Sequence, residues 1–172
     1  MYKLKKKYNN ILTIIIPRHI NRVSYIKNLA SRFGLNSQIL NDNDIIHADT
    51  EILIINSFGV LPKYFSYCKN IFIGKSFIKK LQLVGGQNPI EAAKLGCKIF
   101  HGPYVYNFQE VYGLLKSYGI SEQANDEKEL LKKLSENFKN PKEKNGQQIN
   151  LLNVYGEKIL KQTIKEINKF IK

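Results

Sequence analysis

Residues 88–103, NPIEAAKLGCKIFHGP, place the signal for a helix directly before the signal for a strand. Asn88 is a favoured residue at a helix start, proline is favoured in the first turn, and Gly96 is a typical terminator. The next residues, CKIFHGP (97–103), form a short apolar run that ends in a Gly-Pro turn. We therefore predict a helix over 88–96 and a strand over 97–103, which is the repeating unit of an α/β fold.

The same alternation continues toward both ends of the chain. We predict strands over 11–17 (buried on both faces), 37–40, 51–59, 70–76 and 120–124, and helices over 21–34, 60–68, 107–119, 126–140 and 149–172. Alternating strands and helices predict an α/β domain with a doubly wound parallel sheet, that is, a Rossmann-like fold. In such sheets ligands bind at the carboxyl ends of the strands.

Length and composition limit the class of protein. The 172 residues suit one α/β domain over 11–172, ending in the long helix, after a basic flank or linker over 1–10. The formal net charge of +13 favours an anionic partner such as a phosphate, an acidic lipid surface or nucleic acid, although an ordinary lysine-rich surface explains it equally well. Two cysteines, Cys68 and Cys97, indicate reduced, buried side chains, and no apolar run is long enough to span a membrane. These features predict a soluble, cytoplasmic domain.

The residues before and inside the 88–96 helix suggest a nucleotide site. Gly85 and Gly86 would let a ligand approach the backbone closely, and a helix start near Asn88 favours an anion. Glu91 lies in the first turn, where its carboxylate can accept hydrogen bonds from the two hydroxyls of a ribose. The alternative is an ordinary capped helix whose acid favours its own N-terminus.

Two further loops carry cations at the same predicted edge. Arg18 follows the first strand, and its guanidinium suits a phosphate. Lys75 and Ser76 follow the fourth strand and are further candidate phosphate contacts, although the spacing of a P-loop is missing. In both loops the alternative is a solvated surface. His19 has no carboxylate nearby in sequence to orient it, so we do not predict a catalytic role for it.

The turn after the fifth strand is His101-Gly102-Pro103, followed by Tyr104 and Tyr106. These tyrosines either line a pocket or pack in the fold. The sequence contains no recognisable arrangement for nucleophilic catalysis and no GxGxxG after the first strand. We therefore predict no catalytic residue, no metal site and no cofactor in this chain.

Taken in order, PRHINR, the strand end SFG, FIGKS, GGQNPIEAAKLG and HGPYVYNFQE resemble the C-terminal half of 3-deoxy-D-manno-octulosonic acid (Kdo) transferases, over about residues 11–170. The resemblance implies an inverting, metal-independent GT-B glycosyltransferase of lipopolysaccharide biosynthesis, whose C-terminal domain holds the donor CMP-Kdo. It also implies an N-terminal domain, not matched here, that holds the lipid A precursor, attaches to the membrane and supplies a catalytic glutamate.

The resemblance assigns donor contacts to three segments. These are Pro17 and Arg18, then the turn Phe58, Gly59 and Val60, and then Asn88, Pro89 and Glu91. Two departures are visible. Val60 stands where the family usually has an acid, and Lys75 stands in a segment that is commonly Gly-Gly-Ser.

We therefore expect this chain to bind CMP-Kdo but not to transfer it alone. We expect the full-length enzyme at the cytoplasmic face of the inner membrane, with the basic flank close to an anionic leaflet and with no nucleic-acid partner. One alternative is a free-standing nucleotide or nucleic-acid binder that uses the +13 charge. Another is the corresponding half of a different GT-B enzyme, such as a nucleotide-sugar epimerase that prefers UDP.

Overall fold

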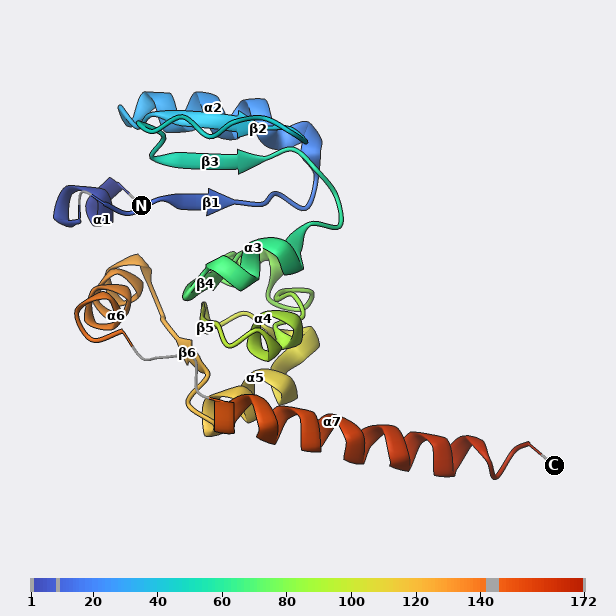
Figure 1. Cartoon of the computed structure of the whole chain (residues 1–172). Coiled ribbons are helices and arrows are strands. Elements are labelled where there is room, and N and C mark those ends of the chain that lie inside the picture. The colour runs from blue at the N-terminus through green and yellow to red at the C-terminus, as the bar shows by residue number, and fades with distance from the viewer. Residues whose placement is uncertain (1, 9, 142–145, 172) are drawn as a thin grey trace. The chain divides into compact units, whose positions relative to one another are not determined.

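The computed structural model describes residues 2–8, 10–141 and 146–171. The chain divides into two compact units, Met1–Leu61 and Pro62–Lys172. Within each unit a three-stranded sheet is formed, and all of its strand pairs are parallel (Figure 1). The predicted α/β class with parallel strands is confirmed, and the hydrogen-bonded strands are grouped in two sheets, one in each unit.

The first unit has the strand order β1-β3-β2. Its described elements are α1 (Tyr2–Lys7), β1 (Thr13–Ile15), a 3₁₀ turn (Ile20–Arg22), α2 (Val23–Arg32), β2 (Ser37–Leu40) and β3 (Ile52–Ile55). The helix α1 lies within the stretch that we expected to be a basic flank, and its Leu4 is buried. Gly34 ends α2 with a φ of +66°, as expected of a terminating glycine.

The apolar run of β3 forms the centre of the first unit. All four residues of β3 are buried, because the strand has a partner on each side. Val23 and Ala30 of α2 pack against Ile52 and Ile54. Our prediction that the first strand is buried on both faces is wrong. The residues of β1 are only half-buried, because β1 pairs with β3 alone and forms an edge of this sheet.

The second unit has the order β4-β5-β6. Its elements are α3 (Leu61–Tyr67), β4 (Asn70–Ile73), a 3₁₀ turn (Lys79–Leu81), α4 (Ile90–Lys94), β5 (Lys98–His101), a 3₁₀ turn (Tyr106–Phe108), α5 (Gln109–Ser117), β6 (Ser121–Gln123), α6 (Glu127–Lys139) and α7 (Gly146–Ile167). Two helix ends have local stabilising features. The backbone N–H of Glu129 donates to Asp126 at 2.8 Å at the start of α6, and Gly96 follows α4 with a φ of +76°, as expected of a terminating glycine.

The core of the second unit is built around β5. Ile99 and Phe100 are fully buried, and the helices contribute Ala92, Ala93 and Leu115 to the apolar interior. Cys97 is buried as predicted, and its thiol lies 3.1 Å from the carbonyl of Phe65. Cys68 is only half-buried, which corrects our prediction for that residue.

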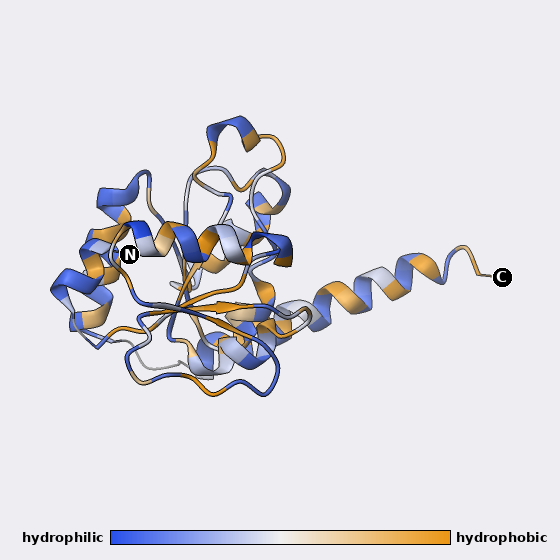
Figure 2. Cartoon of the chain, turned by 90° about the horizontal axis from the view of Figure 1, so that it is seen from above, coloured by the Kyte–Doolittle hydropathy of each residue, from blue (hydrophilic) through white to orange (hydrophobic). Residues whose placement is uncertain are grey.

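The long helix α7 packs on the rest of the second unit through its first turns. Leu152 is buried and packs in the core of the unit, whereas the residues that follow it to the end of the helix are exposed. Hydrophilic and hydrophobic residues alternate along this exposed part (Figure 2). In the part of the chain that the structure describes, we find no helix with the length and apolar content needed to cross a bilayer.

Candidate functional site

The candidate donor contacts fall into both units, and each group is described in its own unit. In the first unit, β1 and β3 are parallel, so the residues after these strands lie at the same edge of the sheet. Arg18 and Phe58 are exposed there, and Gly59 has a φ of +73°. Pro17 and Val60 are half-buried. Their predicted contacts with a donor remain predictions.

Ser76 has a structural role. Its side chain is completely buried, and its hydroxyl donates to the carbonyl of Ile73 at 2.7 Å. The same oxygen accepts the backbone N–H of Gly102 at 2.8 Å, and the Ser76 carbonyl accepts the N–H of Tyr104 at 2.9 Å. The hydroxyl has one proton, which is already donated, so the expected phosphate contact from Ser76 is wrong. Instead, Ser76 joins the loop after β4 to the loop after β5.

Lys75 has an unusual backbone conformation. Its φ is +69°, in the left-handed region that favours glycine. This agrees with the glycine that the resembled family commonly has in this segment. A non-glycine residue held in this conformation costs about 1–3 kcal/mol and is often found at functional sites. Lys75 therefore remains a candidate for contact with an anion.

The two glycines before α4 are explained by the chain itself. A Cβ on Gly85 would collide with the carbonyl oxygen of Tyr104 and would lie 2.9 Å from that of Leu81. A Cβ on Gly86, whose φ is +84°, would lie 3.0 Å from the Cα of Val105. Both glycines are buried. Our explanation that they make room for a ligand is therefore wrong, because the backbone of the next loop occupies that room.

The start of α4 presents one exposed acid. Glu91 is exposed in the first turn, and Asn88 is exposed two residues before the helix. The Asn88 side chain accepts the backbone N–H of Ile90 at 3.0 Å, which leaves one fewer N–H for an anion. The N-cap residue of α4 is Pro89, however, so our prediction that Asn88 caps this helix is wrong. Pro89 is fully buried, so it supports the turn rather than offering a surface. Glu91 is the residue here with a carboxylate available to a ligand.

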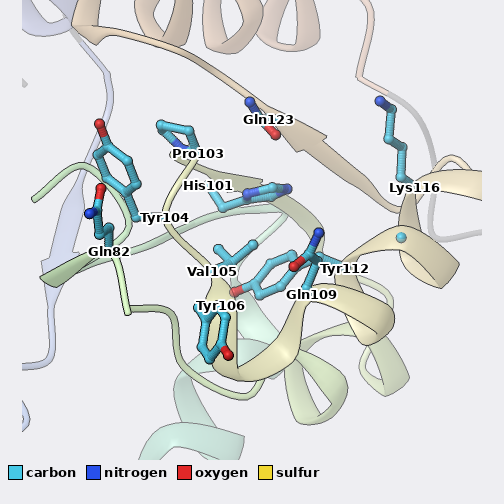
Figure 3. Close-up of a pocket in the computed structure, with 11 residues that line it drawn as sticks. Gln82, His101, Pro103, Tyr104, Val105, Tyr106, Gln109, Tyr112, Lys116 and Gln123 are labelled. Carbon is cyan, nitrogen blue, oxygen red and sulfur yellow. The ribbon is translucent and has the colours of Figure 1, made fainter. Parts of the chain in front are cut away.

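A pocket of about 310 Å³ lies at the carboxyl ends of β5 and β6 (Figure 3). It extends along one face of α5 and is bounded by the loop after β5. Among its lining residues are Gln82, His101, Tyr104, Tyr106, Gln109 and Gln123. Tyr104 and Tyr106 thus line a pocket, which was one of our two interpretations of them. The glutamines gave no signal in the sequence, because they come from three separate segments.

His101 forms the buried wall of this pocket. Its side chain is 3% exposed, and its ring centroid lies 4.3 Å from that of Tyr112 (Figure 3). Burial lowers the pKa of His101 below its ordinary value, against a raising effect of its hydrogen bond to Gly102. The imidazole is therefore neutral at pH 7. Its Nδ1 lies 2.7 Å from the carbonyl oxygen of Gly102, so Nδ1 carries the proton and Nε2 is left as an acceptor.

The neutral His101 predicts a pH dependence of stability. Because its folded pKa is lowered, the unfolded chain takes up a proton that the folded chain does not, once the pH falls below the ordinary value of 6.5. We expect the free energy of unfolding to fall from pH 7.5 to pH 5.5, and this fall to be smaller in His101→Gln. Urea unfolding at the two pH values measures it, with His47→Gln, at an exposed histidine, as control. Equal slopes in wild type and His101→Gln would contradict the prediction.

Two further observations do not indicate a functional site. A cavity of about 510 Å³ in the first unit is lined by residues such as Gly34, Thr50 and Glu51, which precede β2 and β3. It therefore lies at the amino ends of the strands, opposite the edge where ligands bind in such sheets. Among the described residues no three His, Cys, Asp or Glu side chains are grouped to hold a metal ion.

Comparison with known sequences identifies several Kdo transferases and a bifunctional glycosyltransferase/methyltransferase of Fusobacterium nucleatum, 27% identical over 80% of this chain and 22% of that relative. No protein-family model matches the chain. The chain is 25% identical over 134 residues to the 3-deoxy-D-manno-octulosonic acid transferase of Aquifex aeolicus, which covers 78% of this chain and 35% of the relative. It is 31% identical over 133 residues to the transferase of the same name from Rickettsia felis, covering 77% of this chain and 27% of the relative. The chain thus spans about a third of the length of the first relatives.

A solved structure has the same fold. The crystal structure of the C-terminal CMP-Kdo binding domain of WaaA from Acinetobacter baumannii matches with a TM-score of 0.73 and 20% sequence identity. The match covers 92% of this chain and 78% of that one. By sequence the chain is therefore a relative of the Kdo transferases over most of its own length, as its motifs predicted, and it has the fold of that C-terminal domain.

Proposed function

We propose that this chain is the donor-binding part of a Kdo transferase and that it binds CMP-Kdo. The observation that carries the proposal is the extent of its similarity: about 78% of the chain matches a Kdo transferase, and it does so over only about a third of the length of that relative. The fold match is to a domain described as binding CMP-Kdo. Glu91 supports the proposal further, since its exposed carboxylate is accessible to a ribose that donates hydrogen bonds.

The chemistry of the transfer divides into two requirements. A hydroxyl of the acceptor, for which we propose the lipid A precursor, must lose its proton as it attacks the anomeric carbon of Kdo with inversion. The leaving CMP must be stabilised as negative charge grows on its phosphate. Arg18 in the first unit and Lys75 in the second are separate candidates for the second task, and a cationic side chain performs it without a metal ion. We propose that the base belongs to another part of the enzyme, so that this chain binds the donor without transferring it.

The proposal places the full-length enzyme at the cytoplasmic face of the inner membrane. The acceptor is a lipid, so the transfer must take place at a membrane surface. Lys3, Lys5, Lys6 and Lys7 at the start of the chain would be attracted to an anionic leaflet, at about 1 kcal/mol for each lysine close to the surface.

Calorimetric titration of the purified chain tests the nucleotide preference. We expect CMP to bind at least ten times more tightly than UMP or UDP, because a donor site for CMP-Kdo must distinguish the base. A preference for UDP would favour the half of another GT-B enzyme. Binding of arbitrary RNA or DNA that collapses steeply with added salt would favour a nucleic-acid binder instead. Transfer of Kdo to the lipid A precursor by this chain alone would contradict the proposed division of labour.

A further inference from the structure

We propose that the pocket beside α5 binds the acidic sugar of the donor, a polyhydroxylated carboxylate, separately from its nucleotide. The inference rests on the proposed function, and it assigns the sugar to residues that none of the donor-contact predictions included. The pocket of about 310 Å³ is at the small end of the range of about 300–1,000 Å³ that is usual for ligand sites.

One face of α5 forms a continuous wall of this pocket. Gln109, Tyr112, Gly113 and Lys116 all line it, at the spacing i, i+3, i+4 and i+7 that places residues on the same side of a helix. The wall therefore offers, in one row, an amide, an aromatic ring, an open gap and a cation. Such a row fits a ligand that has hydroxyls along its length and a negative charge at one end.

Gly113 is the part of this wall that folding does not explain. It lies in the middle of α5, where glycine weakens a helix relative to alanine. No positive φ requires it, and a Cβ built on it would meet no other atom within 4 Å. Neither backbone conformation nor close packing therefore calls for glycine here. Its effect is to keep the pocket open at this point.

The remaining lining residues agree with a hydroxylated ligand. Gln82 and Gln123 supply neutral amides, and Tyr104 and Tyr106 supply rings and phenol groups. Nε2 of the buried His101 adds a neutral acceptor for a hydroxyl. None of these described lining residues is an Asp or a Glu, whereas the charge of Lys116 is close enough to act on His101. The ligand is therefore expected to be anionic.

The pocket adjoins the segment that leads to Glu91. Tyr112, in the pocket wall, donates its hydroxyl to the carbonyl of Gln87 at 3.0 Å. Gly85 and Gly86 pack against Tyr104 and Val105, which are themselves lining residues of the pocket. The segment that leads to Glu91 is thus in direct contact with residues of the proposed sugar pocket. This arrangement suits a single ligand whose sugar and nucleotide lie next to each other.

The test is a titration of the full chain with free 3-deoxy-D-manno-octulosonic acid, followed by NMR chemical shifts, with D-mannose as the neutral sugar and CMP in a parallel series. We expect the acid to shift pocket resonances saturably and at least ten times more tightly than mannose. Gly113→Leu should weaken the acid at least tenfold and Lys116→Gln about threefold to tenfold, with CMP affinity unchanged in both. Gly156→Leu is the matched control, since Gly156 is also inside a helix with no atom within 4 Å of a built Cβ, but does not line the pocket.

The possible failures can be told apart. If CMP binds but the acid does not, or if Gly113→Leu and Lys116→Gln both bind the acid like wild type, the pocket assignment is overturned. Loss of CMP binding in Gly113→Leu but not in Gly156→Leu would also overturn it, because the pocket would then hold the nucleotide. If the acid binds and responds to the variants while CMP does not bind, the pocket assignment stands and the nucleotide part of the proposed function fails.

Discussion

Replacing Gly102 with alanine is expected to lower the free energy of unfolding by about 3 kcal/mol, the upper part of the range for overpacking a filled interior. A Cβ at this position would collide with the ring of Phe77 and with the backbone carbonyl oxygen of Ser76. A ring can rotate, but the carbonyl oxygen is held by the backbone N–H of Tyr104 at 2.9 Å. The loops after β4 and β5 would therefore have to separate. Urea unfolding of wild type and variant measures the loss.

Gly74→Ala is the control for this change. Gly74 lies in the same loop as Ser76, is exposed, has no positive φ, and a Cβ on it would meet no other atom within 4 Å. Its replacement is expected to change stability by no more than about 1 kcal/mol, in the stabilising direction. If both variants unfold at the same urea concentration, the tight contact between the two loops does not exist in solution.

The elements of the fold could be predicted because their signals are local. The apolar run at Ile52–Ile55 gave β3, and the segment between Asn88 and Gly96 gave α4, although this helix begins at Ile90. The burial of β1 could not be predicted in this way. An edge strand and a central strand have the same apolar composition here, and only the pairing order distinguishes them.

The candidate site was harder to predict because its contacts are not local. Ser76 was expected to face a ligand, and its hydroxyl instead accepts the N–H of a residue 26 positions away. Gly85 and Gly86 were expected to leave room for a ligand, which the backbone of Tyr104 and Val105 fills. In both cases the sequence drew attention to the right residues, but tertiary structure determines which groups these residues contact. Glu91 was predicted from a position in a helix start, which is local, and the structure leaves it exposed.

Removing the carboxylate of Glu91 is expected to weaken CMP binding about tenfold to a hundredfold, which corresponds to about 1–3 kcal/mol for hydrogen bonds to a charged group. Glu91→Ala would leave the two ribose hydroxyls with water as their only partner at this point. Calorimetric titration of the variant with CMP measures the loss. Wild type should bind 2′-deoxy-CMP more weakly than CMP, whereas the variant should bind the two nucleotides with nearly the same affinity.

Glu110→Ala separates this role from a purely structural one. Glu110 is also an exposed acid in the first turn of a helix, so the two variants lose the same favourable interaction with a helix N-terminus, typically about 0.3–1 kcal/mol of stability. If Glu91 only stabilises its own helix, both variants will unfold slightly earlier and both will bind CMP like wild type. A ribose contact instead requires that the two variants agree in stability and differ in affinity, since only one of the acids then touches the ligand.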